Sequence, residues 1–228
     1  MKFASVISIL PAAVFAGKAD IAAQVEAMAA NFSVSERNLI PILGPQLSHI
    51  DGYGCWCYFD GQYTKGRGQP ASLVDAACQQ LQHGYKCAIL DGEEESEECT
   101  PWEVSYLSAS QYGESLLIEK CNELNPSNCA SRACKIEGYF VIAMFQAFFD
   151  PESNHSPALL HENGFDPKVE CPTKTGAKSE YKCCGYYPYT IRPYKTYDGK
   201  RACCNGKTYD AEIYECCADG SRQISCPL

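Results

Sequence analysis

Histidine is scarce in this chain of 228 residues, and this limits the catalytic chemistry that can be assigned to it. The four histidines are spread along the sequence, and their positions define no Ser–His–Asp arrangement. The sequence also lacks a glycine-rich phosphate loop. Cys55-x-Cys57 lacks the wider gap of zinc-binding cysteine pairs, so disulfide formation is the expected fate of its thiols. The histidines are His49, His83, His155 and His161.

Positive charge and long apolar runs are also limited. The formal net charge is −9, and residues 171–228 hold a modest excess of Lys and Arg over Asp and Glu. No basic patch is large enough to predict nucleic-acid binding, and the acidic remainder disfavours anionic membrane surfaces. Beyond the N-terminus, no apolar run reaches the ~18 residues that a membrane-spanning helix needs. We therefore expect no nucleic-acid partner and no transmembrane segment.

The N-terminus has the pattern of a secretory signal peptide. Met1-Lys2 supplies a positive start, an apolar stretch follows, and Val14 and Ala16 are small residues before a cleavage point. The sixteen cysteines agree, because such a content is typical of disulfide-linked secreted chains. We predict a signal peptide at residues 1–16 and a secreted, extracellular protein.

The cysteines fall into two groups of eight, one between Cys55 and Cys134 and one between Cys171 and Cys226. This division predicts two independently cross-linked domains, although eight cysteines allow 105 pairings and the pattern selects none of them. The second group contains three vicinal Cys-Cys pairs. Vicinal cysteines pair with each other only under strain, so each is expected to pair elsewhere.

Hydrophobic periodicity predicts two helices in the first part of the chain. Apolar residues recur at three- and four-residue steps over 71–87, and the apolar stretch 129–149 ends before Asp150-Pro151. Cysteines on both segments suggest an antiparallel pair joined by disulfides. Residues 52–68 are expected to form a loop. The acidic run 91–99 is also expected to be a solvated loop. The repeated Lys-Thr-Tyr-Asp motifs at 195–198 and 207–210 indicate short strands and turns.

Two short motifs resemble the secreted phospholipase A2 superfamily. Tyr53-Gly-Cys-Trp-Cys57 is similar to the start of its calcium loop, and Ala77-Cys78 followed by Gly84-Tyr85 is similar to its catalytic helix. The likeness covers about residues 30–165 and implies a mainly α, disulfide-rich fold with an antiparallel helix pair and a Cys57–Cys78 disulfide. We assign 17–165 to this phospholipase A2-like domain, 166–182 to a linker, and 183–228 to a small β or irregular cysteine-rich module.

The resemblance also implies which chemistry has been lost. The family uses a histidine as general base and a neighbouring carboxylate to hold calcium, but the matching positions are Leu81 and Gln82. Neither residue supplies a base or a charged ligand, so no catalytic residue and no cofactor are assigned. A second acid of the family is expected near Asn128 or Ser131 and is not evident. The retained framework is Tyr53 and Tyr85, and the vestigial calcium loop is Trp56, Tyr58, Asp60 and Gly61.

His83 is the alternative base. It lies two residues beyond Leu81, which is about 200° around a helix, so it should point away from the Leu81 face. Using it would place Gly84 at the carboxylate position and spoil the match of Gly84-Tyr85. We expect His83 to be an exposed histidine and Leu81 to pack in the core.

The C-terminal module resembles the di-cysteine repeats of galaxins, which are skeletal-matrix proteins. The shared features are the Cys-Cys pairs, the glycine that follows them, and Tyr-Asp between them. Together the two resemblances predict a structural or binding component of an extracellular matrix, coat or filament, with extracellular proteins or its own copies as partners. The alternatives are a divergent calcium-dependent phospholipase and a lipid-binding domain that reuses the acyl channel. Asn31 and Asn154 fit the N-glycosylation sequon.

Overall fold

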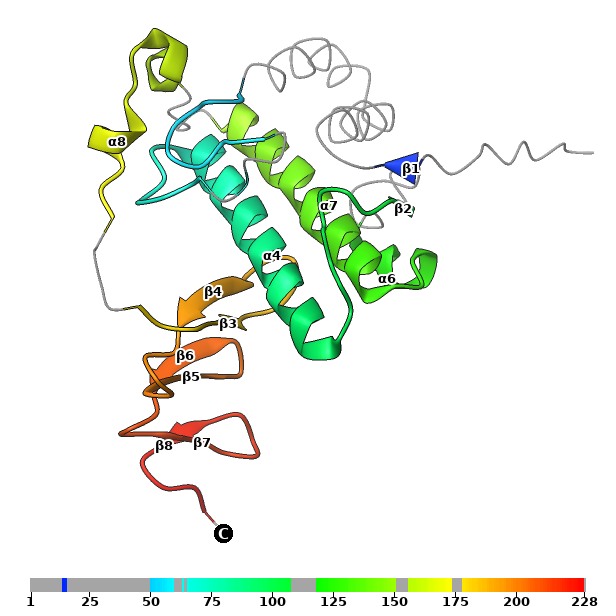
Figure 1. Ribbon diagram of the computed structural model, residues 1–228, viewed down its shortest axis with the longest axis vertical. Helices are drawn as coiled ribbons and strands as arrows, with labels where there is room; N and C mark the ends of the chain where they lie inside the picture. The colour runs from blue at the N-terminus through cyan, green and yellow to red at the C-terminus, as the bar shows by residue number, and fades with distance from the viewer. Residues whose placement is uncertain are drawn as a thin grey trace, which may run out of the picture.

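Two long helices and a row of short hairpins make up most of the computed structural model (Figure 1). The structure describes residues 14–15, 50–59, 63, 65–107, 118–150, 156–173 and 178–227. The expected glycosylation sites Asn31 and Asn154 lie outside these ranges, as do Asp60 and Gly61 of the calcium loop. So does the expected signal peptide, apart from β1 (Val14–Phe15), which pairs antiparallel with β2 (Tyr106–Leu107).

Helix α4 spans Leu73–Glu95, so the predicted helix over 71–87 is confirmed and extends further. Ser72 caps its start by accepting a hydrogen bond from the backbone N–H of Asp75. The helix ends at Ser96, whose φ of 59° is left-handed. The apolar residues that recur at three- and four-residue steps are buried, as the periodicity predicted: Val74, Ala77, Cys78, Leu81, Tyr85 and Ala88.

The expectation of a loop over 91–99 is therefore wrong for residues 91–95. Glutamate has a good helix propensity, and this stretch also has partners that a solvated loop would lack. Glu95 accepts hydrogen bonds from Arg132 and Asn128. Just beyond the helix, Glu97 accepts a hydrogen bond from the backbone N–H of Cys129. The acidic run thus lies at the N-terminal end of the second long helix, where negative charge is favoured.

That second helix, α7, spans Asn128–Phe149 and confirms the helix predicted over 129–149. Ser127 caps its start and Asp150 follows its last residue. The two helices run antiparallel, because the end of α4 meets the start of α7 through the Arg132–Glu95 ion pair. Gly84 lets them approach closely: a Cβ there would lie 2.9 Å from the side chain of Ile136. Their facing sides form the main core, which contains Leu81, Tyr85, Phe140, Val141 and Met144.

Shorter elements surround the pair. Helix α6 (Cys121–Leu124) packs on α7. The 3-10 turns η2 (Pro157–Leu159) and η3 (His161–Asn163) pack against the loop 50–59, where the backbone N–H of Gly54 donates to Leu159 and that of His161 donates to Gly52. Helix α8 (Pro167–Glu170) follows. The predicted linker 166–182 therefore begins with an ordered helical turn.

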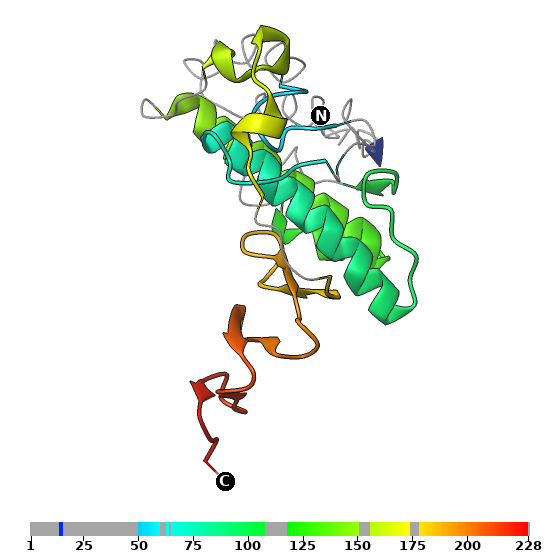
Figure 2. The same ribbon diagram turned by 60° about the vertical axis from the view of Figure 1, so that its left-hand side comes forward.

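The C-terminal part consists of two-stranded antiparallel hairpins, three of them among the described residues. They are β3 (Tyr181–Cys184) with β4 (Arg192–Lys195), β5 (Arg201–Cys204) with β6 (Lys207–Asp210), and β7 (Glu215–Cys216) with β8 (Arg222–Gln223). They follow one another away from the helices, as Figures 1 and 2 show. The prediction of short strands and turns is confirmed.

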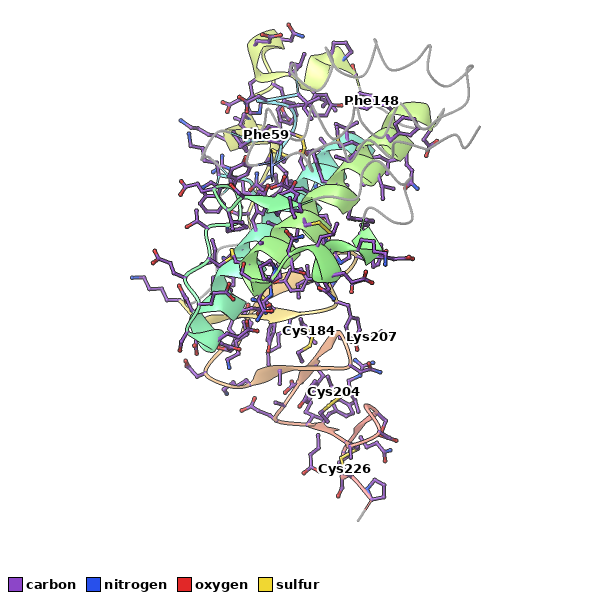
Figure 3. All side chains as sticks on the ribbon, turned by 90° about the vertical axis from the view of Figure 1, so that its right-hand side faces the viewer. Phe59, Phe148, Cys184, Cys204, Lys207 and Cys226 are labelled. Atoms are coloured by element: carbon purple, nitrogen blue, oxygen red, sulfur yellow. A yellow bond between two sulfur atoms is a disulfide. The ribbon has the colours of Figure 1, made fainter. Side chains whose placement is uncertain are left out.

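All sixteen cysteines form disulfides, which is typical of a chain that folds in an oxidising compartment. The vicinal pairs do pair elsewhere, and they join each hairpin to its neighbours; Figure 3 shows Cys184, Cys204 and Cys226 in succession along the tail. The bonds of this disulfide ladder are Cys87–Cys183, Cys184–Cys203, Cys204–Cys216 and Cys217–Cys226.

The prediction of two independently cross-linked cysteine groups is wrong. Cys55–Cys171 and Cys87–Cys183 each join the first group to the second. No disulfide connects α4 directly to α7. The nearest is Cys99–Cys129, which joins the segment after α4 to the start of α7. A disulfide therefore cross-links the tail to α4.

Candidate functional site

The loop 50–59 lies beside the candidate site, and a buried aspartate accepts hydrogen bonds from its backbone. Asp75, in the first turn of α4, is fully buried and accepts hydrogen bonds from the backbone N–H groups of Cys55 (2.8 Å) and Trp56 (2.7 Å). Burial raises the pKa of its carboxyl group, although these hydrogen bonds act in the opposite direction. Gly54, at φ +59°, lies so close that a Cβ would be 2.5 Å from this carboxyl group.

Sequence reasoning missed Asp75. The available signal was an acid three residues after Ser72, at the start of an apolar helical pattern. The Cys57–Cys78 disulfide that the family resemblance implied joins this loop to α4. Tyr53 is buried, and burial raises the pKa of its hydroxyl group. Tyr58 is partly buried, with its ring 5.4 Å from that of His161.

The expected packing role of Leu81 agrees with its surroundings. Its side chain is only 2% exposed and belongs to the main core beside Tyr85 and Phe140. A hydrocarbon in that position can neither accept a proton nor orient a water molecule.

Gln82 has a more specific role, because its amide connects the segments around Trp56 and Gly66. Its Oε1 accepts a hydrogen bond from the backbone N–H of Gly66 at 3.2 Å. Its Nε2 donates to the backbone carbonyl of Trp56. The side chain is buried and neutral. Gln82 therefore fastens the loop to α4 with a donor and an acceptor, where the resemblance implies a calcium-binding carboxylate.

These residues do not fit a calcium ion. Calcium takes six to eight oxygen ligands, usually with carboxylates among them. Here the Trp56 carbonyl faces an N–H group, whose partial positive charge would repel a cation. Across the described ranges, no three or more His, Cys, Asp or Glu side chains gather as a metal site.

Helix α7 carries a buried acid that the sequence analysis did not single out. Glu137 is fully buried and accepts hydrogen bonds from the hydroxyl groups of Tyr85 (2.7 Å) and Tyr106 (2.6 Å). The acid was expected near Asn128 or Ser131, but these residues bond to Glu95 and Asn122 instead. Glu137 meets Tyr85 across the interface between α4 and α7.

Tyr85 is present where the resemblance implies a tyrosine, but the position implied for the histidine holds Leu81. Burial, followed by the nearby charge of Glu137, raises the pKa of its hydroxyl group well above the usual value. The phenol therefore stays a hydrogen-bond donor at physiological pH. The Tyr85–Glu137–Tyr106 group is a buried hydrogen-bond network.

His83 is not the exposed residue that the sequence predicted. It is half-buried, and its ring meets that of Trp56 edge-on, with centroids 5.0 Å apart. Burial, then the charges of Lys86 and Arg192, lower its pKa to about 4. No hydrogen bond joins His83 to a carboxylate in the described part of the chain, so no described acid orients the ring as a general base would require.

His83 lines a cleft of about 460 Å³ that we call the hairpin cleft. Its lining comes from the segments around Trp56 and Gly66, from one side of α4 and from the β3–β4 hairpin, and Trp102 and Thr173 complete it. Leu81 does not line it, because Leu81 faces the core on another side of α4. The prediction that His83 and Leu81 point in different directions is confirmed.

The lowered pKa of His83 predicts a pH-dependent stability. The folded-state pKa lies below the unfolded value of about 6.5, so the unfolded chain binds the additional proton. Stability that is present above pH 6.5 is therefore lost as the pH falls towards 4. We expect His83 to account for roughly 2 kcal/mol of the loss between pH 7 and pH 5.

Urea denaturation of the wild type and His83→Gln at both pH values will measure this contribution. The variant should lose less stability than the wild type. Lys86→Gln serves as a second variant, since removing that charge should raise the pKa of His83 and weaken the pH dependence. Equal losses in all three proteins would contradict the assignment.

No helix among the described residues is long and apolar enough to cross a membrane. No model of a known protein family matches the sequence, and no curated protein matches it. The resemblance to secreted phospholipases A2 therefore rests on the two short motifs, Tyr53–Cys57 and Ala77–Tyr85.

Proposed function

We propose that this chain is a secreted, non-catalytic relative of phospholipase A2 that serves as a structural or binding component of an extracellular matrix, coat or filament. The observation that carries the proposal is the amide of Gln82. Its two hydrogen bonds hold the loop by a means that needs no metal. Leu81, one residue earlier, is buried and chemically inert.

The tail supports the structural part of the proposal. Its hairpins have little hydrophobic core of their own, and disulfides stabilise them instead, as is common in small secreted modules. Large apolar side chains with high exposure gather there. The tail holds seven of the nine exposed large hydrophobic residues found in the described part of the chain: Tyr181, Tyr186, Tyr189, Tyr197, Ile213, Tyr214 and Ile224. Such side chains suit contacts with a partner surface.

The catalytic part of the proposal is tested with phospholipid micelles in the presence and absence of calcium. We expect no release of fatty acid above the blank and no shift in melting temperature when calcium is added. Calcium-dependent release that is abolished by His83→Gln would establish the alternative, a divergent phospholipase. Tight binding of a fatty acid that fails when Leu81→Trp fills the core would instead support a lipid-binding domain.

The structural part is tested by locating the protein made by secreting cells. We expect the wild type to enter the insoluble extracellular fraction. The triple variant Ile213→Ser, Tyr214→Ser and Ile224→Ser should remain in the medium. The matched control is Leu73→Ser with Val169→Ser, which removes exposed apolar side chains outside the tail. Wild-type protein that stays entirely in the medium, with no partner recovered, would contradict the proposal.

A further inference from the structure

The hairpin cleft is built jointly by the helical part and the tail. Trp56 and Arg67 come from the loop, His83 and Lys86 from α4, and Tyr181 and Lys195 from the β3–β4 hairpin. Its volume of about 460 Å³ lies within the range of small-molecule sites. The cleft could not be predicted from the sequence, because Tyr181 and Lys195 lie far along the chain from Trp56 and His83.

The walls of the cleft are held in place before any ligand arrives. Cys87–Cys183 joins α4 to β3. The side chain of Gln80 donates to the backbone carbonyls of Pro188 (2.9 Å) and Ile191 (3.2 Å). The amide of Gln82 fastens the opposite wall. A preformed cleft loses little conformational entropy on binding, which favours a specific ligand.

The cleft is positively charged in a chain that is acidic overall. Lys86, Lys195 and Arg67 line it, and no Asp or Glu is among its described lining residues. Lys86 forms no ion pair with a described carboxylate; its ammonium group lies 3.4 Å from the centre of the Tyr181 ring. Burial and the neighbouring charge of Lys195 lower the pKa of Lys86. Clustered cations of this kind favour an anionic ligand.

The other feature of the cleft is its aromatic lining. Trp56, Trp102 and Tyr181 line it, and the indole N–H of Trp56 donates to the backbone carbonyl of Gly68 at 3.2 Å, which fixes the ring. Aromatic side chains pack well against other rings by stacking or edge-to-face contact. The cleft thus offers planar surfaces beside converging positive charges.

We propose that the hairpin cleft binds a small aromatic acid, an organic molecule in which a planar ring system carries a carboxylate or sulfonate group. The ring lies between Trp56 and Tyr181, and the acidic group faces Lys86 and Lys195. This site differs from the acyl channel of the phospholipase family, because the tail hairpin supplies one of its walls and Leu81 is not part of it. The proposal does not depend on whether the chain hydrolyses lipids.

The experiment uses 1-anilinonaphthalene-8-sulfonate as the probe and the full-length folded protein. Both tryptophans of the chain line the cleft, so energy transfer from tryptophan to the probe reports binding, and the lysine variants locate it. We expect saturable transfer that weakens with added salt. Lys86→Gln combined with Lys195→Gln should weaken binding by roughly tenfold. N-phenyl-1-naphthylamine, which lacks the sulfonate, should bind weakly and equally to both proteins.

The matched control is Lys200→Gln with Lys207→Gln, which makes the same change in charge on the tail at residues outside the cleft. It should bind the probe as the wild type does, and melting temperatures will verify that each variant folds. Three outcomes would overturn the proposal: unchanged binding in the Lys86/Lys195 variant, equal loss in the control, or equally tight binding of the neutral probe. Displacement of the probe by dodecanoate at a lower concentration than by 2-naphthoate would also overturn it.

Discussion

Replacing Glu137 with alanine should lower the free energy of unfolding by roughly 3–5 kcal/mol. The carboxylate is fully buried and accepts hydrogen bonds from Tyr85 and Tyr106. Alanine would leave both hydroxyl groups without their acceptor and would open a cavity between α4 and α7. Urea denaturation of the full chain with its disulfides intact will measure the change.

Two further variants separate the network from simple loss of volume. Glu137→Gln keeps the shape and one good acceptor, so we expect a cost of roughly 1–2 kcal/mol. Tyr106→Phe should destabilise the wild type, but it should cost little in the Glu137→Ala background, because the hydroxyl group has already lost its acceptor. If Glu137→Ala unfolds at the same urea concentration as the wild type, the network does not stabilise the fold.

Replacing Cys87 and Cys183 with serine should lower the free energy of unfolding by roughly 3–5 kcal/mol. This disulfide spans 96 residues and joins the β3–β4 hairpin to α4. Its loss should loosen the hairpin on α4, because each of the remaining polar contacts is individually weak. These are the hydrogen bonds from Gln80 to Pro188 and Ile191, the hydrogen bond between Tyr187 and Asp91, the contact of Lys86 with the Tyr181 ring, and the exposed Lys182–Glu94 ion pair. Hydrogen exchange of the β3–β4 backbone will report the release.

The matched control removes Cys217–Cys226, which spans nine residues at the far end of the ladder. Its expected cost is smaller, roughly 2–3 kcal/mol, since a short loop constrains the unfolded chain less. Faster exchange should then be confined to β7 and β8. Exchange at β3 and β4 that is unaffected by loss of Cys87–Cys183 would show that contacts alone hold the first hairpin.

The candidate site could be predicted only in part from the sequence. The match of Cys78 and Tyr85 to the family motif puts Leu81 and Gln82 at the positions that the resemblance gives to the histidine and the carboxylate, since all four residues lie on one helix. The partners of Gln82 could not be predicted, because Gly66 and Trp56 reach it only through the path of the loop. His83 was assigned to the surface, because helical geometry says which way a residue points but not what covers it.

The sequence by itself determined the two long helices, the short C-terminal strands and the need for each vicinal cysteine to pair elsewhere. These features depend on residues within a few positions of one another, so periodicity and local strain are enough to encode them.

Only the tertiary structure decided the disulfide pairing beyond Cys57–Cys78, the place of Glu137 and the existence of the hairpin cleft. Tyr85 and Glu137 are 52 residues apart, and Cys87 and Cys183 are 96 residues apart. Such partners are selected by how whole helices and hairpins pack, and no local pattern in the chain records that choice.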